Sequence, residues 1–346
     1  MKAYLGPSGQ GCHNLAVLNV LTVTFPFFAL VLCGFVAARR GMLPLAAIPG
    51  LNSFVLFFAL PCMLYRFGAS TPISQLLDAS VALTYLVCAL VMVAFVVAVT
   101  LRKHIGWNDA AFGALVGAFP NTGFMGVPLL VALLGPKAAG PAIVTILVDM
   151  VITSSLCIGL SRLGAEQRGA QDGAAQGNAA RQAVKNALKG VATNPMPWSI
   201  LLGAVVSALQ IEFPKPVVQT VGLLADSASP VALFTIGAVL ARSQMLARDD
   251  ASHAVHWRDY VPVALIKLLL HPVLVFLVGA SAIQLGVPLD RFAFMVLVLL
   301  AALPSASNVS LLAERFGADN GRIARIILVS TAAAFFTFSG AVALMT

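Results

Sequence analysis

Runs of about 20 apolar, mostly uncharged residues recur along the whole chain, and they restrict it to one class of fold. A run of this length, wound as an α-helix, can cross the hydrocarbon core of a membrane. The 346 residues are 60% hydrophobic and only 10% charged, and ten such spans can be drawn. We therefore predict an all-α, multi-pass membrane protein. The predicted spans are 15–38, 47–65, 79–101, 110–134, 138–161, 196–212, 218–241, 260–284, 291–316 and 322–345.

The basic residues predict how these spans are oriented. Loops after odd-numbered spans hold 15 Lys and Arg, the opposite side holds 5, and Lys267 lies inside the eighth span. Because positively charged loops remain in the cytoplasm, both termini are expected outside it. The net charge of +8 is thus explained by membrane topology, and we expect no nucleic-acid partner.

A polar segment at 162–195 divides the chain into residues 1–161 and 196–346. Its first part is rich in Ala, Gly and Gln and is typical of a flexible linker. Its second part, "RQAVKNALKGVA", spaces Arg181, Lys185 and Lys189 four residues apart. This spacing favours an amphipathic helix on the anionic cytoplasmic leaflet, with an ordinary basic loop as the equal alternative.

The two halves carry similar motifs in the same order. "FPFFALVLCG" from Phe25 aligns with "MPWSILLGAV" from Met196, and "LPCMLYRFGA" from Leu60 aligns with "SPVALFTIGA" from Ser229. Each half has five spans, so the second half enters the membrane upside down relative to the first. The sequence therefore predicts a 5 + 5 inverted repeat, as in many secondary transporters.

Spans four and nine are interrupted near their centres by Pro120 and Pro304. Proline removes a backbone donor, and open backbone is tolerated inside a membrane only where protein or a wet cavity surrounds it. We predict that both helices break and cross, so that their half-helix N-termini bind an anion and their carbonyl ends a cation. Simple proline kinks are the alternative. The breaks supply small polar residues, Asn121, Thr122 and Gly123 in span four and Ser305, Ser307 and Asn308 in span nine.

Three ionisable residues fall within predicted spans, where an unpaired charge costs about 3 kcal/mol or more. Asp149 is near the middle of span five, and it either carries a coupling H⁺ or Na⁺ or is a hydrogen-bonded structural residue. Asp226, in span seven, is a second candidate for ion coupling. Lys267 either reaches back to the interface or pairs with a carboxylate. We expect no metal site, because the nearest histidine pair lies in a loop without further ligands.

Four segments resemble the auxin efflux carrier family, which includes plant PIN-type carriers and bacterial malonate and malate carriers. "NTGFMGVPLL" is similar to the family's fourth span, and the other three are similar to its second, seventh and ninth. The Asn-Thr-Gly break is the most specific part, and the likeness covers essentially the whole chain. The other segments are "LNSFVLFFALP" (51–61), "SPVALFTIGAVLA" (229–241) and "LPSASNVSLLAERFGAD" (303–319).

This resemblance implies a ten-span inverted repeat related to bile-acid sodium symporters. It implies a scaffold of spans 1, 2, 6 and 7, a transport domain of spans 3–5 and 8–10, elevator-like movement and a homodimer. The substrate carboxylate would meet Asn121, while the residues after Pro304 vary across the family. The short central loop is like that of bacterial members, which implies a bacterial inner membrane.

The leading hypothesis is a secondary transporter of a small carboxylate, with malonate or another dicarboxylate first, coupled to H⁺ or Na⁺ and needing no other cofactor. A passive uniporter or exporter, a channel and a non-transporting receptor are alternatives. An intramembrane hydrolase with Asp149 and Asp226 as a dyad is a further one. The chain lacks the Gly-x-Gly-Asp, His-Glu-x-x-His and Gly-x-Ser-x-Gly motifs of such enzymes, so we do not expect an enzyme.

Overall fold

The structure, a computed structural model, describes residues 9–70, 78–102, 104–169, 195–249 and 256–345. Within these ranges the elements are helical, apart from isolated β-bridges between Arg102 and Ile105 and between Pro120 and Ser305. The predicted amphipathic segment with Arg181, Lys185 and Lys189 lies outside the described residues.

Most predicted spans correspond to one helix or to a continuous series of helices. In chain order the α-helices are α1 (Gly9–Arg39), α2 (Ile48–Phe54), α3 (Leu60–Ser70), α5 (Ala79–Thr100), α6 (Trp107–Ala118), α7 (Val127–Leu134), α8 (Ala139–Val148), α9 (Ser154–Gly169), α11 (Pro195–Ala208), α12 (Lys215–Asp249), α13 (Trp257–Leu265), α14 (His271–Gln284), α15 (Arg291–Ala301), α16 (Asn308–Arg315) and α17 (Asn320–Met345). Short π-helical segments join several of these, namely η2 (Val55–Ala59), η3 (Thr122–Gly126), η5 (Asp149–Thr153) and η6 (Ile266–Leu270).

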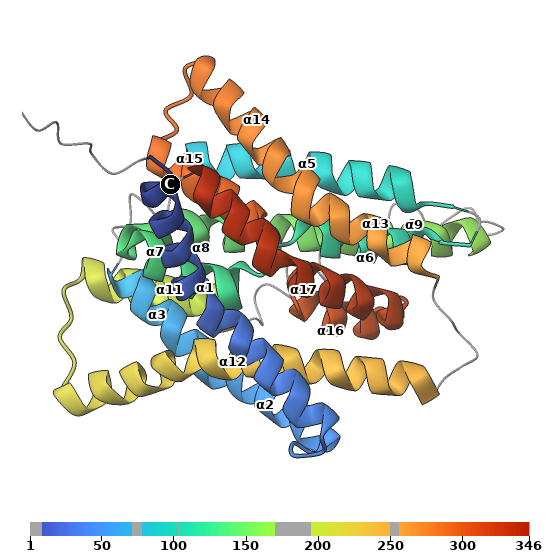
Figure 1. The fold of residues 1–346 in the computed structure, drawn as a ribbon, viewed down its shortest axis with the longest axis horizontal. Coiled ribbons are helices and arrows are strands. Elements are labelled where there is room, and N and C mark those ends of the chain that lie inside the picture. The colour runs from blue at the N-terminus through green and yellow to red at the C-terminus, as the bar shows by residue number, and fades with distance from the viewer. Residues whose placement is uncertain (1–8, 71–77, 103, 170–194, 250–255, 346) are drawn as a thin grey trace, which may run out of the picture.

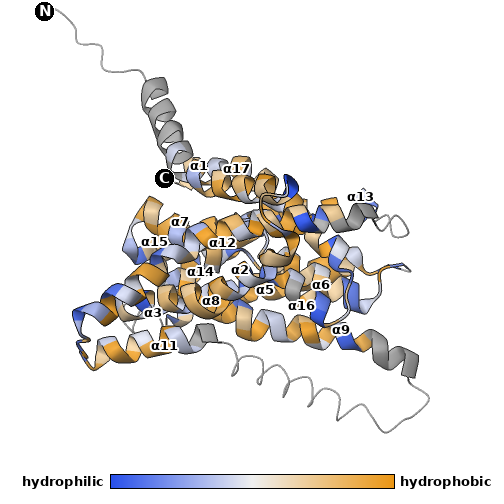
Figure 2. Ribbon diagram, turned by 90° about the horizontal axis from the view of Figure 1, so that it is seen from below, coloured by the Kyte–Doolittle hydropathy of each residue, from blue (hydrophilic) through white to orange (hydrophobic). Residues whose placement is uncertain are grey.

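Six of the described helical stretches are long and apolar enough to cross a membrane, which confirms a multi-pass, all-helical protein. They are Leu45–Ser70, Ala79–Thr100, Pro136–Leu163, Lys215–Arg242, Trp257–Gln284 and Asn320–Met345. Four shorter apolar helices, Thr24–Arg39, Thr122–Leu134, Trp198–Ala208 and Arg291–Ala301, fall in the remaining predicted spans. Hydrophobic residues cover the lengths of the helices, while hydrophilic ones gather toward the helix ends and loops (Figure 2).

Prolines explain three of the π-helical segments. Pro61, Pro128 and Pro272 each lie two residues after the end of one, at η2, η3 and η6. Because proline has no N–H, the carbonyl one turn earlier loses its donor, and the helix widens there to find another. The sequence predicts simple kinks at Pro61 and Pro272; the structure instead shows a widened turn before each. Pro26 and Pro230 lie inside continuous helices, α1 and α12.

The helices form two groups (Figure 1). In the first, α1 packs along α12, and α3 packs against both α11 and α12. In the second, α5 packs against α6 and α14, α6 against α9, and α13 against α17. The helix α17 contacts α1 and α12, so it joins the two groups.

The first group is built around two close backbone crossings. A Cβ on Gly34 would lie 1.8 Å from the Phe234 carbonyl oxygen, and one on Gly203 would lie 2.1 Å from that of Tyr65. Only glycine permits such an approach. The same offset, 169 residues, separates Gly34 from Gly203 and Tyr65 from Phe234. The two crossings are therefore equivalent contacts, with the roles of the two halves exchanged.

A second pair of glycines follows the same rule. A Cβ on Gly237 would lie 1.8 Å from the Val31 carbonyl oxygen, and one on Gly68 would lie 2.3 Å from that of Ile200. These positions are again 169 residues apart. The alignment of "LPCMLYRFGA" with "SPVALFTIGA" has this register, whereas that of "FPFFALVLCG" with "MPWSILLGAV" is wrong by two residues. Short apolar runs give an alignment too few fixed points, and the glycine contacts supply them.

We expect Gly237→Ala to destabilise the protein by about 1–3 kcal/mol or more, because the new methyl group overlaps a backbone carbonyl that cannot move away. Gly222→Ala is the matched control in the same helix, because a Cβ there meets nothing within 4 Å. That change should raise stability by roughly 0.5–1 kcal/mol. Thermal unfolding of both variants in detergent measures the difference, and equal melting temperatures would contradict the close crossing.

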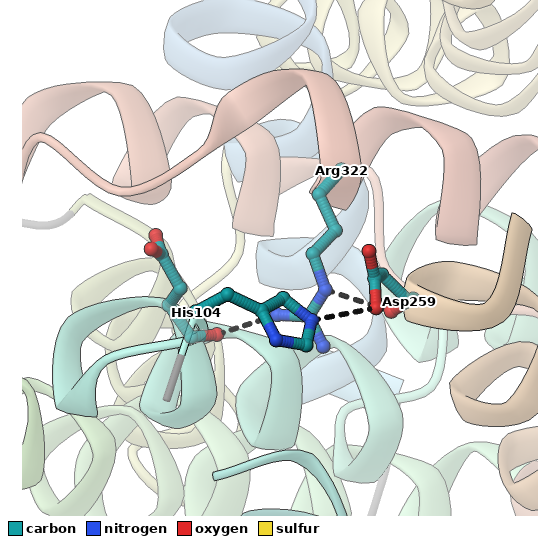
Figure 3. A network of polar contacts seen from close by, with 4 residues as sticks. His104, Asp259 and Arg322 are labelled. Atoms are coloured by element: carbon teal, nitrogen blue, oxygen red, sulfur yellow. Dashed lines mark hydrogen bonds and ion pairs between the residues drawn. The ribbon is translucent and has the colours of Figure 1, made fainter. Parts of the chain in front are cut away.

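A buried arginine ties the starts of α6, α13 and α17 together (Figure 3). Arg322 donates from Nε to the Asp259 carbonyl and from Nη1 to the Asp109 carbonyl, both at 2.8 Å. The Asp259 carboxylate in turn pairs with His104 at 3.1 Å. The sequence treats Arg322 as a loop charge; in the structure it is buried, because helix N-termini provide carbonyl acceptors around it.

Candidate functional site

The backbone of the chain crosses itself where the two interrupted spans break. After α6 ends at Ala118, the chain is non-helical until η3, and Pro120 forms a bridge with Ser305, which follows α15. The Asn121 N–H donates to the Pro304 carbonyl at 2.8 Å, and the Ala306 N–H donates to the Phe119 carbonyl at 2.9 Å. As the sequence predicts, the two breaks meet. Each one satisfies backbone groups that proline leaves open in the other.

Polar side chains without partners surround this crossing. The Thr122 and Ser305 hydroxyls and the Asn308 amide oxygen are buried, and none has a hydrogen-bond partner among the described residues. Asn121 is buried as well, and its side chain makes no capping bond to the helix that it precedes. Leaving a buried polar group unpaired costs about 1–3 kcal/mol, so a cluster of them is unusual in a structural core. The cluster indicates a site for a ligand that hydrogen-bonds.

A cleft opens beside the crossing, between the two groups of helices. Ser307, which precedes α16, Asn308 on α16 and Phe124 on η3 form one wall. Asn52 on α2 and Thr235 on α12 face them from the other. The remaining lining residues are Val55, Ala232, Ile236, Val239 and Ser310. The cleft therefore joins residues after Pro304 to helices of the other group.

We expect Thr122→Val to weaken ligand binding by about tenfold without lowering stability. The substitution keeps the shape of the side chain and removes a hydroxyl that is buried and unpaired, so the free protein loses no hydrogen bond. Thr145→Val is the matched control, because the Thr145 hydroxyl donates to the Ala142 carbonyl at 2.8 Å. The control should lose about 1 kcal/mol of stability and keep its affinity. The reverse pattern in melting temperature and ligand affinity would contradict a ligand role for Thr122.

Asp149 and Lys267 belong to one buried cluster behind the crossing, and each is 0% exposed. The Tyr85 hydroxyl donates to Asp149 Oδ2 at 2.6 Å, and Thr153 donates to Oδ1 at 3.0 Å. Lys267 Nζ lies 2.8 Å from the Ala301 carbonyl oxygen and 2.9 Å from His271 Nδ1. The expectation that Lys267 reaches back to the membrane interface is wrong, because its nitrogen finds acceptors inside the protein.

Asp226 is not part of this cluster. It forms an ion pair with Arg66 at 2.6 Å, between α12 and α3, and the two side chains are 67% and 44% exposed. The structure does not bring Asp226 to Asp149, as an aspartate dyad would require. The geometry gives no support to the hydrolase alternative.

The sequence identifies the breaks but not the far wall of the cleft. Asn52 and Thr235 receive no role in the sequence analysis, although both lie in segments that resemble the family. The available signal was a polar residue within an apolar span. Tyr85 was also missed, because a tyrosine in a membrane helix is common and only its hydroxyl bond to Asp149 distinguishes it.

The fold and the site define a multi-pass membrane protein with a polar site at two crossing helix breaks. A family model described as "Membrane transport protein" matches residues 19–342. The chain therefore belongs to this family, the auxin efflux carrier family of membrane transporters.

Curated relatives agree with this assignment. The chain is 30% identical over 329 residues to a "Putative malonate transporter" of Rhizobium meliloti, covering 93% of this chain and 94% of the relative. It is 25% identical to "Uncharacterized transporter YfdV" of Escherichia coli, covering 84% and 86%. It is 22% identical to "Auxin efflux carrier component 8" of Arabidopsis thaliana, covering 84% and 87%.

Proposed function

We propose that this protein is a secondary transporter of a small organic anion, whose carboxylate binds where the two broken helices cross. The observation that carries the proposal is the group of buried, unpaired side chains at the crossing, Thr122, Ser305 and Asn308. Hydroxyls and amides donate hydrogen bonds to carboxylates, and the Asn121 amide is free to join them. The helix starts that follow both breaks add partial positive charge.

The proposed architecture is ten spans arranged as a 5 + 5 inverted repeat. The paired glycine contacts, which exchange roles at an offset of 169 residues, support it. In this arrangement spans 1, 2, 6 and 7 form the scaffold, and spans 3–5 and 8–10 form the transport domain. The cleft between the two groups of helices supports an elevator mechanism, in which the crossing moves past Asn52 and Thr235.

The proposed location is a bacterial inner membrane, with both termini outside the cytoplasm. The 15-to-5 distribution of basic residues supports the orientation. The end of α17 lies beside the start of α1 in Figure 1, which suits an even number of spans. A homodimer through the scaffold is the proposed assembly, and the function needs no cofactor other than a coupling ion.

A dicarboxylate such as malonate is the proposed substrate class. Two helix starts converge on the site, so two carboxylates can each find donors. The name of the Rhizobium meliloti relative favours malonate within this class. Import of an anion against a negative membrane potential costs about 2.3 kcal/mol per charge per 100 mV, so it requires a co-transported H⁺ or Na⁺.

Counterflow in proteoliposomes tests the proposed function. Vesicles loaded with unlabelled malonate should take up external labelled malonate far faster than protein-free vesicles. A panel of unlabelled mono- and dicarboxylates then ranks substrates by competition. If no acid in the panel supports counterflow with correctly inserted protein, the proposal is wrong.

A further inference from the structure

The carbonyl end of α15 is already occupied by a cation that belongs to the protein. Helix C-termini carry partial negative charge and unpaired carbonyls, and at a helix break these attract a cation. The Ala301 carbonyl, in the last residue of α15, accepts a bond from Lys267 Nζ at 2.8 Å. An ammonium has three donors and no acceptor, so its remaining contact with His271 Nδ1 is also a donated bond.

Other carbonyls at the crossing are engaged as well. Phe119 accepts from Ala306, Pro304 accepts from Asn121, and Pro120 accepts from the Thr122 N–H at 2.7 Å. A bound Na⁺ needs several oxygen ligands from unwound backbone of this kind. Here those oxygens already receive protein donors, and a Na⁺ beside Ala301 would meet the charge of Lys267.

We infer that Lys267 is a built-in cation that stands where a transported Na⁺ would bind, and that this protein couples anion movement to protons through Asp149. The inference rests on the proposed transport function and selects one coupling ion for it. It is carried by the position of the Lys267 ammonium at the end of α15 and by the buried carboxylate of Asp149 in the same cluster.

The charges balance through one proton. Without it, the Asp149 carboxylate and the Lys267 ammonium, which interact electrostatically, together carry no net charge. One proton from outside adds to a carboxylate oxygen of Asp149, giving the cluster a charge of +1 that moves with the anion. The O–H bond then breaks inside and the proton leaves to the cytoplasm. No other bond changes.

The neighbouring helices supply the other titratable groups near this cluster. His271 lies on the same helix series as Lys267, and its Nε2 is buried without a partner among the described residues. Tyr85 and Cys88 come from α5, and Cys157 comes from α9. The only charged residue of α15, Arg291, is at its far end. On α17, Arg322 is bonded to carbonyls at the start of the helix.

A test without substrate compares the melting temperature of the purified protein in NaCl, KCl and choline chloride at equal ionic strength. The wild type should show no Na⁺-specific rise. Lys267→Ala vacates the cation position, leaves the Ala301 carbonyl and Asp149 without it, and should gain a Na⁺-specific rise of a few degrees. A Na⁺-specific rise in the wild type, or a folded Lys267→Ala variant indifferent to Na⁺, would overturn the inference.

A second test uses wild-type proteoliposomes and therefore does not depend on the folding of a variant. An inward proton gradient should drive malonate accumulation at least tenfold above that under an inward Na⁺ gradient at equal pH. Accumulation driven by Na⁺ alone, or by neither ion, overturns proton coupling. Absent malonate counterflow would instead count against the proposed function, while the melting experiment would still decide the inference.

Discussion

Asn121→Ala is expected to reduce transport by roughly ten- to hundredfold and to leave the fold intact. A hydrogen bond to a charged group contributes about 1.5–3 kcal/mol, and tenfold in affinity corresponds to about 1.4 kcal/mol. The Asn121 backbone holds the crossing through its N–H and carbonyl, whereas its side chain makes no capping bond. Substitution should therefore remove a ligand contact and keep the backbone bonds. Counterflow and the melting temperature of the same preparation measure the two effects.

Asn108→Ala provides the matched control for this prediction. The Asn108 amide donates to the Phe316 carbonyl at 3.1 Å, away from the breaks. Its removal should lower stability by about 1 kcal/mol and spare counterflow. Wild-type counterflow by correctly inserted Asn121→Ala protein would exclude Asn121 as a substrate contact.

Asp149→Asn should abolish accumulation of the substrate while preserving exchange. The amide resembles the protonated carboxyl and cannot release a proton, so the cluster would stay in its loaded form. It can still receive the hydroxyl bond of Thr153. We expect counterflow within about threefold of the wild type, loss of concentrative uptake, and a flat dependence of binding on pH.

The control here is Asp226→Asn, whose carboxylate pairs with Arg66 on an exposed surface. Exposed pairs of this kind contribute about 0–1 kcal/mol, so that variant should accumulate substrate normally. Proteoliposomes with an imposed proton gradient compare the two variants directly. If Asp149→Asn concentrates substrate as the wild type does, Asp149 has no part in coupling.

The sequence predicts the breaks and their meeting because proline acts locally. Pro120 and Pro304 each remove one donor, and the middle of an apolar span offers no water to replace it. Short polar side chains after each proline then mark the same place. The long apolar runs likewise fix the helical class, since an unpaired backbone cannot lie in lipid.

The cleft and the buried cluster depend on contacts between distant segments, which local patterns do not encode. Lys267 finds the Ala301 carbonyl on another helix, so its depth within the span gave the wrong expectation. The glycine crossings fix the register of the repeat by backbone contact, whereas the alignment of apolar runs at Phe25 and Met196 missed it by two residues. The opposite wall, Asn52 and Thr235, becomes evident only when α2 and α12 lie beside α16.

A cryo-electron microscopy structure of the protein with bound malonate, or with the acid that competes best in counterflow, tests the central claim most directly. The account predicts ligand density between η3 and α16, with carboxylate oxygens within hydrogen-bond distance of Asn121, Thr122 and Asn308. Density away from both helix breaks, with the Thr122 and Ser305 hydroxyls still unpaired, would contradict it.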